Sequence, residues 1–207
     1  MSEFFHEFMR LAGPEEPKTR TNYEANFRNH VDPVLGSRAI RDVDVEAVAE
    51  LLATIRAKWR RSRGDGKATV RQIHALIRRI FNVAVKLGRL PRYFPNPAAA
   101  IEVPNPEPRG VRPLDAWEVE AIVGAIRPMY RPLVYVMGYS GLRIGEASAL
   151  QWKHLDLDGG WVHVRRAYKE SGGELYLGTP KDDDIRTCHC FPASWTRSGS
   201  IGRRSRR

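Results

Sequence analysis

Apolar residues in the first part of the chain recur with the spacing of a helix. Between Thr69 and Leu87 they fall three or four positions apart, along one face of an α-helix. The same spacing predicts helices over residues 44–63, 19–31 and 3–11, so residues 1–90 are predicted to form a small all-helical bundle. The side chains of the two longest helices that are expected to point inward are Val45, Val48, Leu51, Leu52, Ile55, Ile73, Leu76, Ile77, Ile80, Val83, Ala84 and Leu87.

Proline marks a boundary after this helical part. Seven of the 14 prolines lie between Pro91 and Pro113. Because proline fixes φ and removes a backbone donor, neither a helix nor a central strand is expected to persist there. Residues 91–113 are therefore predicted to be an interdomain linker.

The periodicity changes beyond the linker. Asp115 and Glu118 have the spacing of a capping box and predict a helix that reaches Ile126. A largely buried helix is expected at Tyr130–Tyr139, and another begins at Arg143. Short strands separated by turn residues are predicted at 161–165, 174–177 and 185–188. The second half is thus α+β, and the fold class as a whole is mainly α with a small β-sheet.

Composition and charge limit the class of protein. The 207 residues carry a formal charge of +10. No apolar run approaches the ~18 residues of a membrane span, and the N-terminus has no apolar secretory core. A cytoplasmic protein without a membrane partner is expected. Residues 188–207 hold five arginines and no acid, which predicts a disordered basic tail. Cys188 and Cys190 form one cluster without a second half-site, so no metal site is predicted.

Basic residues on the predicted helices suggest nucleic acid as a partner. Phosphate contacts need Lys and Arg side chains gathered on one surface. The helix over 44–63 ends in a basic cluster around Trp59, and the helix over 69–87 carries arginines beside its apolar face. The alternative is a solvated charged face without a ligand. The candidate DNA-binding residues are Arg56, Lys58, Arg60, Arg61, Arg63, Arg71 and Arg78.

The second half also holds a longer motif. Residues 138–150 are GYSGLRIGEASAL, followed by WKHLDLD at 152–158 and then by Gly178-Thr179-Pro180-Lys181 with Arg186-Thr187. In order and spacing these segments resemble the TGLRxGE…L, W.DID and TKT…RR motifs of the tyrosine recombinases, the phage-integrase family. The resemblance runs from about residue 18 to residue 187 and includes Asn96-Pro97 and the segment from Tyr23 to Gly36.

This resemblance implies a domain plan and an ancestral function. Residues 1–90 would be a helical core-binding domain that binds double-stranded DNA resembling an attachment site. Residues 114–187 would be the N-terminal half of the catalytic domain of a site-specific recombination and integration protein. The family needs neither a metal nor a nucleotide cofactor. Full-length recombinase protomers are possible further partners.

The resemblance also assigns three site residues. Arg143 would be the first catalytic arginine, since a guanidinium can hold a phosphate bidentately. Glu146, three residues on, shares its helix face and would orient it. Lys181 matches the hairpin lysine that protonates the leaving 5′ oxygen. The alternatives are a purely structural Arg–Glu pair and a solvated turn, in which the aspartates at 182–184 raise the pKa of the lysine and repel phosphate.

The later part of the family pattern has no counterpart in this sequence. In the family, a His-x-x-Arg motif and the tyrosine nucleophile stand downstream of the hairpin. Here the last of seven tyrosines is Tyr176, and the string from His163 to Arg166 lies in a predicted strand before the lysine.

The missing part of the family pattern leads to three expectations and three alternatives. The chain as written is expected to be inactive alone, to leave apolar surface at residues 130–150 uncovered, and to reflect a frameshift or truncation near residue 187. A genuine short protein with a nucleic-acid-binding tail is the alternative origin. In function, the alternatives are a non-enzymatic DNA-binding protein that occupies or regulates recombination sites, or a non-functional gene remnant.

Overall fold

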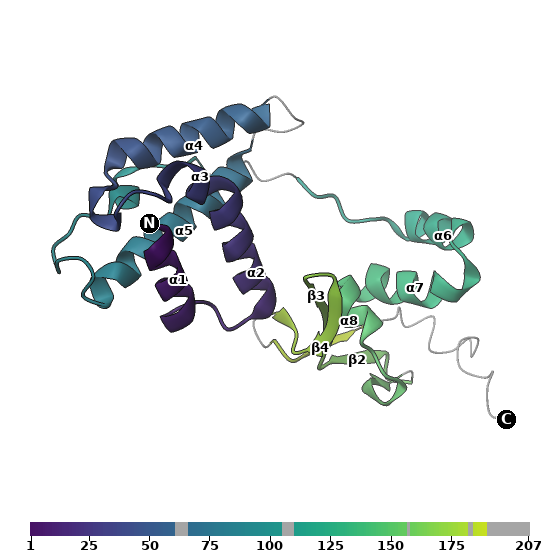
Figure 1. Cartoon of the computed structure of the whole chain (residues 1–207). Coiled ribbons are helices and arrows are strands. Elements are labelled where there is room, and N and C mark those ends of the chain that lie inside the picture. Colours follow the sequence, from purple (N-terminus) through teal and green to yellow (C-terminus); the bar gives the residue numbers. More distant parts are fainter. Residues whose placement is uncertain (61–65, 105–109, 157, 182–183, 190–207) are drawn as a thin grey trace. The chain divides into compact units, whose positions relative to one another are not determined.

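A computed structural model describes residues 1–60, 66–104, 110–156, 158–181 and 184–189. The chain divides into two compact units, Met1–Arg109 and Gly110–Arg207 (Figure 1). The division falls inside the stretch predicted as a linker. In the described part, no helix is long and apolar enough to cross a membrane.

The first unit is built from helices, as its apolar spacing predicts. The two longest are α4 and α5, and proline opens α2, where the missing N–H costs nothing. Its elements are α1 (Ser2–Leu11), α2 (Pro17–Asn26), the π-helical turn η1 (Phe27–Val31), α3 (Asp32–Leu35), η2 (Ile40–Asp42), α4 (Val45–Arg60), α5 (Lys67–Lys86) and η3 (Pro97–Ala100).

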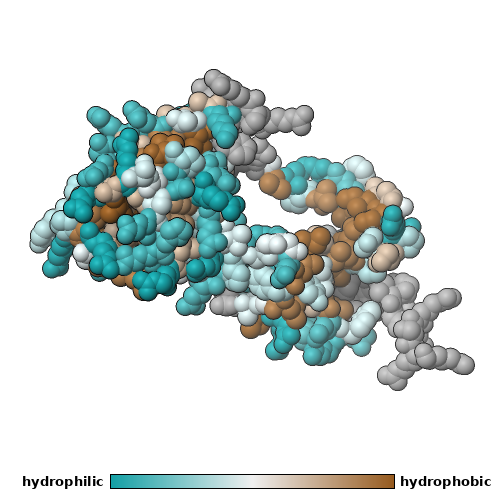
Figure 2. All heavy atoms as spheres, in the orientation of Figure 1, coloured by the Kyte–Doolittle hydropathy of each residue, from teal (hydrophilic) through white to brown (hydrophobic). Residues whose placement is uncertain are grey.

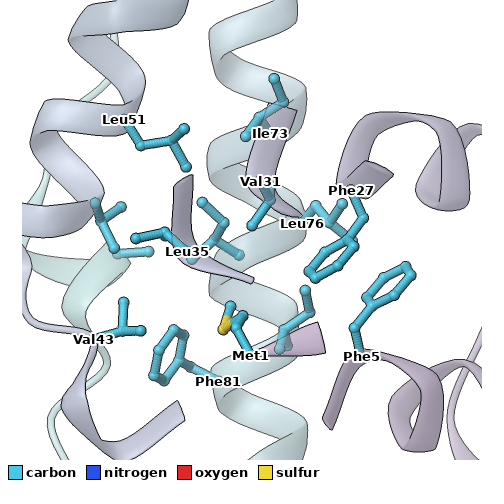
Figure 3. Close-up of a cluster of buried hydrophobic side chains, with 14 of the residues drawn as sticks. Met1, Phe5, Phe27, Val31, Leu35, Val43, Leu51, Ile73, Leu76 and Phe81 are labelled. Carbon is cyan, nitrogen blue, oxygen red and sulfur yellow. The ribbon is translucent and has the colours of Figure 1, made fainter. Parts of the chain in front are cut away.

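Aromatic and aliphatic side chains from α1, η1, α4 and α5 form one core. Phe8 and Phe81 are fully buried, and the rings of Phe5 and Phe27 stack with their centroids 3.7 Å apart (Figure 3). Most residues predicted to point inward are buried here. Val45 and Leu87 are exceptions, with 41% and 37% of their surfaces exposed, because the first begins α4 and the second follows the end of α5.

Part of the predicted linker belongs to this core. Pro97 begins the short helix η3, and Ala98 is fully buried. Asn96 fastens the segment to α5, since its amide nitrogen donates to the Arg78 carbonyl at 2.9 Å and to the Asn82 side chain at 2.8 Å. The linker prediction is therefore wrong for these residues: proline is compatible with the first turn of a 3₁₀ helix, and alanines supply a small packing surface.

The second unit combines three α-helices with two small antiparallel sheets (Figure 1). The capping box of Asp115 and Glu118 opens α6 as predicted. Strand order is β1-β2-β5 in one sheet, and β3 pairs with β4 in a separate hairpin. The elements are α6 (Ala116–Ala125), η4 (Pro128–Tyr130), α7 (Arg131–Ser140), α8 (Ile144–Ser148), η5 (Trp152–His154), β1 (Leu155–Asp156), β2 (Trp161–Val164), β3 (Ala167–Ser171), β4 (Glu174–Gly178) and β5 (Arg186–His189).

Helix α7 is not the buried helix that its composition predicts. None of its residues is buried, because α6, α8 and β5 contact only part of its circumference. The core of this unit is small and centres on Leu142, Ala147, Val162 and Val164. Apolar side chains on and after α6 remain exposed, among them Trp117 (69%) and Met129 (72%). Figure 2 shows this apolar surface over α6 and α7.

Gly145 lets strand β3 lie against α8. A Cβ at this position would sit closer to the Tyr168 carbonyl oxygen than Cβ atoms ever approach a neighbour. We expect Gly145→Ala to lower the free energy of unfolding by about 1–3 kcal/mol, the usual cost of overpacking. The matched control is Gly124→Ala on α6, where the added methyl meets nothing within 4 Å.

This control should stabilise the protein by up to about 1 kcal/mol, as alanine favours helix. Urea unfolding measures both variants. Equal stabilities would mean that β3 and α8 are not in the close contact described.

Candidate functional site

The break between α7 and α8 presents Arg143. Gly141 ends α7 in the left-handed conformation (φ 66°), and the Ser140 hydroxyl donates to the Val136 carbonyl in the last turn. Arg143 then serves as the N-cap of α8. Its side chain is 60% exposed, so most of the guanidinium faces solvent at the point where the chain turns into the helix.

Glu146 anchors this arginine from inside the fold. It is 1% exposed and is the one buried charged side chain in the part of the chain that the structure describes. Its Oε2 accepts from the Arg143 backbone N at 3.0 Å, and its Oε1 accepts from Arg143 Nη1 at 3.0 Å. The pair expected from the three-residue spacing is therefore present.

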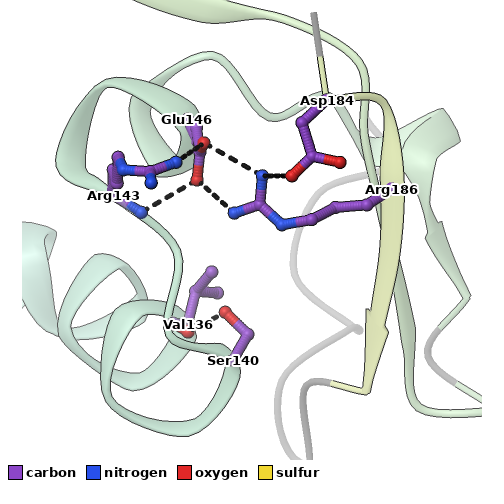
Figure 4. Close-up of polar contacts among 6 residues, drawn as sticks. All are labelled: Val136, Ser140, Arg143, Glu146, Asp184 and Arg186. Carbon is purple, nitrogen blue, oxygen red and sulfur yellow. Dashed lines mark hydrogen bonds and ion pairs between the residues drawn. The ribbon is translucent and has the colours of Figure 1, made fainter. Parts of the chain in front are cut away.

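A second arginine, Arg186 from β5, completes the cluster. Its Nη1 donates to Glu146 Oε1 at 3.1 Å and its Nη2 to Glu146 Oε2 at 2.8 Å (Figure 4). Arg186 Nη1 also donates to Asp184 at 3.2 Å. Glu146 thus accepts four hydrogen bonds, about as many as a carboxylate can take. Every contact uses the ionised form of the carboxylate.

The electrostatics follow from this geometry. Burial would raise the pKa of Glu146, but the hydrogen bonds from Arg186 and Arg143 outweigh it and hold that pKa below 4.5. The hydrogen bond to Glu146 in turn raises the pKa of Arg186 above its ordinary value. Glu146 therefore stays ionised at neutral pH although it is buried.

The chain is similar in sequence to phage integrases. The integrase of Mycobacterium phage D29 is 26% identical over 165 residues, which are 79% of this chain and 41% of the phage protein. The integrase of Mycobacterium phage L5 has the same identity over the same length, 42% of its own chain. This chain thus spans less than half the length of these relatives. No protein-family model matches the sequence.

Solved integrases share the fold. The Tn1549 transposon integrase, in complex with transposon right end DNA, superposes with a TM-score of 0.72 at 19% identity, over 91% of this chain and 60% of that one. A lambda integrase dimer bound to a COC′ core site gives 0.64 at 17% identity, over 86% and 59%. In sequence the chain is therefore similar to phage integrases, and in fold it is similar to solved integrases.

The remaining candidate residue lies in the turn that leads to β5. Lys181 is exposed in the turn before β5, and its carbonyl accepts from the Asp184 backbone N at 3.4 Å. Residues 182–183 lie outside the described residues. His163 Nδ1 lies 2.9 Å from the Thr187 hydroxyl oxygen.

Arg186 had no assigned role among the candidate residues. The signal that points to it is its place in the recombinase hairpin motif after Lys181. Its contact with Glu146 spans 40 positions, so only the pairing of β5 with β2 brings it there. Val164 lies opposite Arg186 in that register.

The candidate DNA-binding residues of the helical unit fall on α4 and α5. Arg56 and Lys58 are exposed on α4, and Arg60 is the last residue of that helix. Arg61 and Arg63 lie outside the described residues. Arg71 and Arg78 are exposed on α5.

The solvent face of α5 carries several basic side chains and no acidic one. The helix contains no acidic residue, and a groove along it is lined by Ala75, Arg78, Arg79, Asn82 and Lys86 together with neighbouring side chains. The Arg79 guanidinium lies over the Tyr23 ring, 5.9 Å from its centroid, which holds it at the edge of this face. Such a surface suits the phosphates of a duplex.

Proposed function

We propose that this chain is a cytoplasmic DNA-binding protein of site-specific recombination and integration, and that Arg143 contacts a DNA phosphate. One observation carries the proposal: a solvent-exposed guanidinium is fixed to a fully buried, fully hydrogen-bonded Glu146. The related folds support it, because the Tn1549 and lambda integrases were solved as complexes with DNA.

The chemistry of Arg143 suits phosphoryl transfer. A guanidinium has five N–H donors, and one from Arg143 is directed to Glu146 in the described contacts. The donors that face solvent match two oxygens of a phosphate, where charge grows as the phosphorus becomes five-coordinate. Lys181 would donate a proton to the leaving oxygen from the adjacent turn. The plain alternative, a structural Arg–Glu pair, does not explain why the arginine end is exposed.

The helical unit would supply much of the affinity. Arg71 and Arg78 stand on the acid-free face of α5, and Arg56 and Lys58 are exposed on α4. Contacts of this kind bind the backbone of any duplex, and their number sets the salt dependence. The sequence preferred by the protein depends on further contacts to base edges.

A covalent-adduct assay tests the catalytic part of the proposal. We expect the 207-residue polypeptide to bind duplex DNA in a salt-dependent manner and to form no protein–DNA adduct on a denaturing gel. The reason is that all seven tyrosines, the last being Tyr176, precede the hairpin lysine, whereas the family's nucleophile follows it. Supercoiled DNA with candidate attachment sites is the substrate.

The outcomes separate the alternatives. Binding without an adduct fits a DNA-binding protein that occupies recombination sites. An adduct would show that another nucleophile serves. No binding at low salt would contradict the proposed function itself.

Partner recombinase protomers are also proposed. Lambda integrase has been solved as a dimer on a core site and as a tetramer on a Holliday junction. The exposed apolar side chains of the second unit, such as Trp117 and Met129, offer a surface that such an assembly would bury.

A further inference from the structure

Arg143 and Glu146 alone would form a weak unit. They are three positions apart at the start of a helix of five residues, and one side-chain hydrogen bond, from Arg143 Nη1 to Glu146 Oε1, joins them. Arg143 is 60% exposed, so its own packing does little to fix it. The orientation of its guanidinium must come mainly from the carboxylate to which it is bound.

Arg186 determines how that carboxylate is oriented. Its two terminal nitrogens engage the two oxygens of Glu146 side by side, at 3.1 and 2.8 Å, and such a bidentate pair fixes the plane of the carboxylate. The same two oxygens receive Arg143 Nη1 and the Arg143 backbone N, each at 3.0 Å. Figure 4 shows both arginines converging on Glu146 from opposite sides.

We propose that Arg186 is a positioning residue that sets the orientation of Arg143 through Glu146 and links it to the Lys181 turn through Asp184. The inference rests on the proposed function of Arg143 as a phosphate ligand. Arg186 Nη1 reaches Asp184 at 3.2 Å, and the Asp184 backbone N reaches the Lys181 carbonyl at 3.4 Å. A single side chain thus connects the elements that carry the two candidate catalytic cations.

Arg186 does not itself present a phosphate site. Its side chain is 26% exposed, and its terminal nitrogens donate to two carboxylates, Glu146 and Asp184. Its charge is therefore already compensated within the fold. Arg143, by contrast, contacts one carboxylate among the described residues, and most of its side chain is in solvent. The two arginines therefore have different roles: Arg186 holds the Glu146 carboxylate, and Arg143 faces the DNA phosphate.

The first test measures the order of Arg143 without DNA. NMR relaxation of the Nε–H group of ¹⁵N-labelled arginine, assigned by the loss of one signal in Arg143→Lys, reports how tightly the guanidinium is held. In Arg186→Lys the positive charge remains but the bidentate geometry is lost. In this variant we expect the order parameter of the Arg143 Nε–H group to fall from about 0.85, typical of a rigid group, to below about 0.6, typical of a flexible one.

A role in charge balance alone predicts a different result. Lysine would then replace Arg186 without loss, and unchanged order of Arg143 in Arg186→Lys would overturn the inference. Arg165→Lys is the matched control, since Arg165 is an exposed arginine next to the β2 residue that pairs with Arg186. If Arg186→Lys fails to fold, Arg186→Gln leaves the Glu146 carboxylate in place beside Arg143, and the same loss of order is expected there.

A double-mutant cycle on DNA binding gives the second test. Affinity for a duplex is measured for the parent, Arg143→Met, Arg186→Lys and the combined variant at several salt concentrations. Arg143→Met should reduce the slope of log affinity against log salt by about one, the signature of one phosphate contact. Arg186→Lys should weaken binding in the parent and have no effect when Arg143 is already replaced.

Additive effects would show that Arg186 contacts DNA directly, which would overturn the positioning role. If Arg143→Met leaves binding unchanged, the phosphate contact of the proposed function fails. The order of Arg143 measured without DNA still decides whether Arg186 positions it.

Discussion

Glu146→Ala should lower the free energy of unfolding by about 3 kcal/mol. The substitution deletes a side chain that is 1% exposed and leaves the donors of Arg143 and Arg186 without the carboxylate that satisfies them. Hydrogen bonds to a charged group contribute about 1.5–3 kcal/mol each, but both arginines can reach water, which reduces the loss. The expected value therefore lies well below the sum of four bonds.

A matched acid in the same unit provides the control. Glu120 is exposed, and its carboxylate accepts one hydrogen bond from the Tyr135 hydroxyl at 2.8 Å. Glu120→Ala should cost less than about 1 kcal/mol, because the groups left behind are solvated. Urea unfolding of both variants at neutral pH measures the difference. Equal effects would mean that the buried cluster contributes nothing beyond an exposed contact.

The pH dependence of stability gives an independent measure of Glu146. Its pKa in the folded protein is lowered from 4.5, because the hydrogen bonds from Arg186 and Arg143 outweigh the desolvation that would raise it. The unfolded chain therefore binds this proton at a higher pH than the folded protein. The stabilisation is complete above about pH 4.5 and is lost as the pH falls from there through the folded pKa.

Glu146→Gln should flatten this acid limb. Glu7 and Glu118 also have lowered pKa values, because of hydrogen bonds from Arg89 and Arg112, so the limb will shrink rather than vanish. Unfolding midpoints between pH 3 and 7 in the parent and the variant give the difference. An unchanged acid limb would show that Glu146 is not held ionised by the two arginines.

Local signals in the sequence predict the helical part of the fold well. The capping box at Asp115 and the three- and four-residue spacing of apolar residues in α5 each depend only on neighbours along the chain, so they can be recognised from the sequence alone. The burial of Pro97 and Ala98 cannot be recognised in this way, because it depends on contacts with helices that are distant in the sequence. Composition alone makes that segment look like a linker.

Strand β3 shows why the sheet is harder to predict. The sequence of β3, AYKES, does not alternate between apolar and polar residues, so it lacks the pattern that predicts a half-buried strand. Its partner β4 covers the strand predicted at 174–177. The backbone ladder from Ala167 to Ser171 holds them together. The turn at Gly172-Gly173 was visible in the sequence, but the strand before it was not.

Only the part of the candidate site formed by residues close in the sequence could be predicted. Arg143 and Glu146 are three residues apart, so a helix alone brings them together. Arg186 joins them across 40 positions, through a strand pairing that the sequence does not specify. Motif resemblance indicated the right hairpin without indicating which side chain turns inward.

The combined variant Arg71→Gln/Arg78→Gln should weaken duplex binding by about tenfold at low salt and lower the salt slope by about two. Both side chains are exposed on α5, whose surface carries no acid to compensate them. Each phosphate contact releases about one counterion, so removing two contacts reduces the salt dependence along with the affinity. Stability should change little, because neither side chain is buried.

Net charge must be separated from position. Arg38→Gln/Arg41→Gln makes the same change in charge on exposed arginines near η2 in the same unit. If α5 is the DNA-binding face, this control loses only the long-range attraction, about twofold or less, and keeps its salt slope. Fluorescence anisotropy with one labelled duplex, from 50 to 200 mM salt, compares the two variants. Equal losses in both would show that binding follows total charge, and the assignment of α5 would then be wrong.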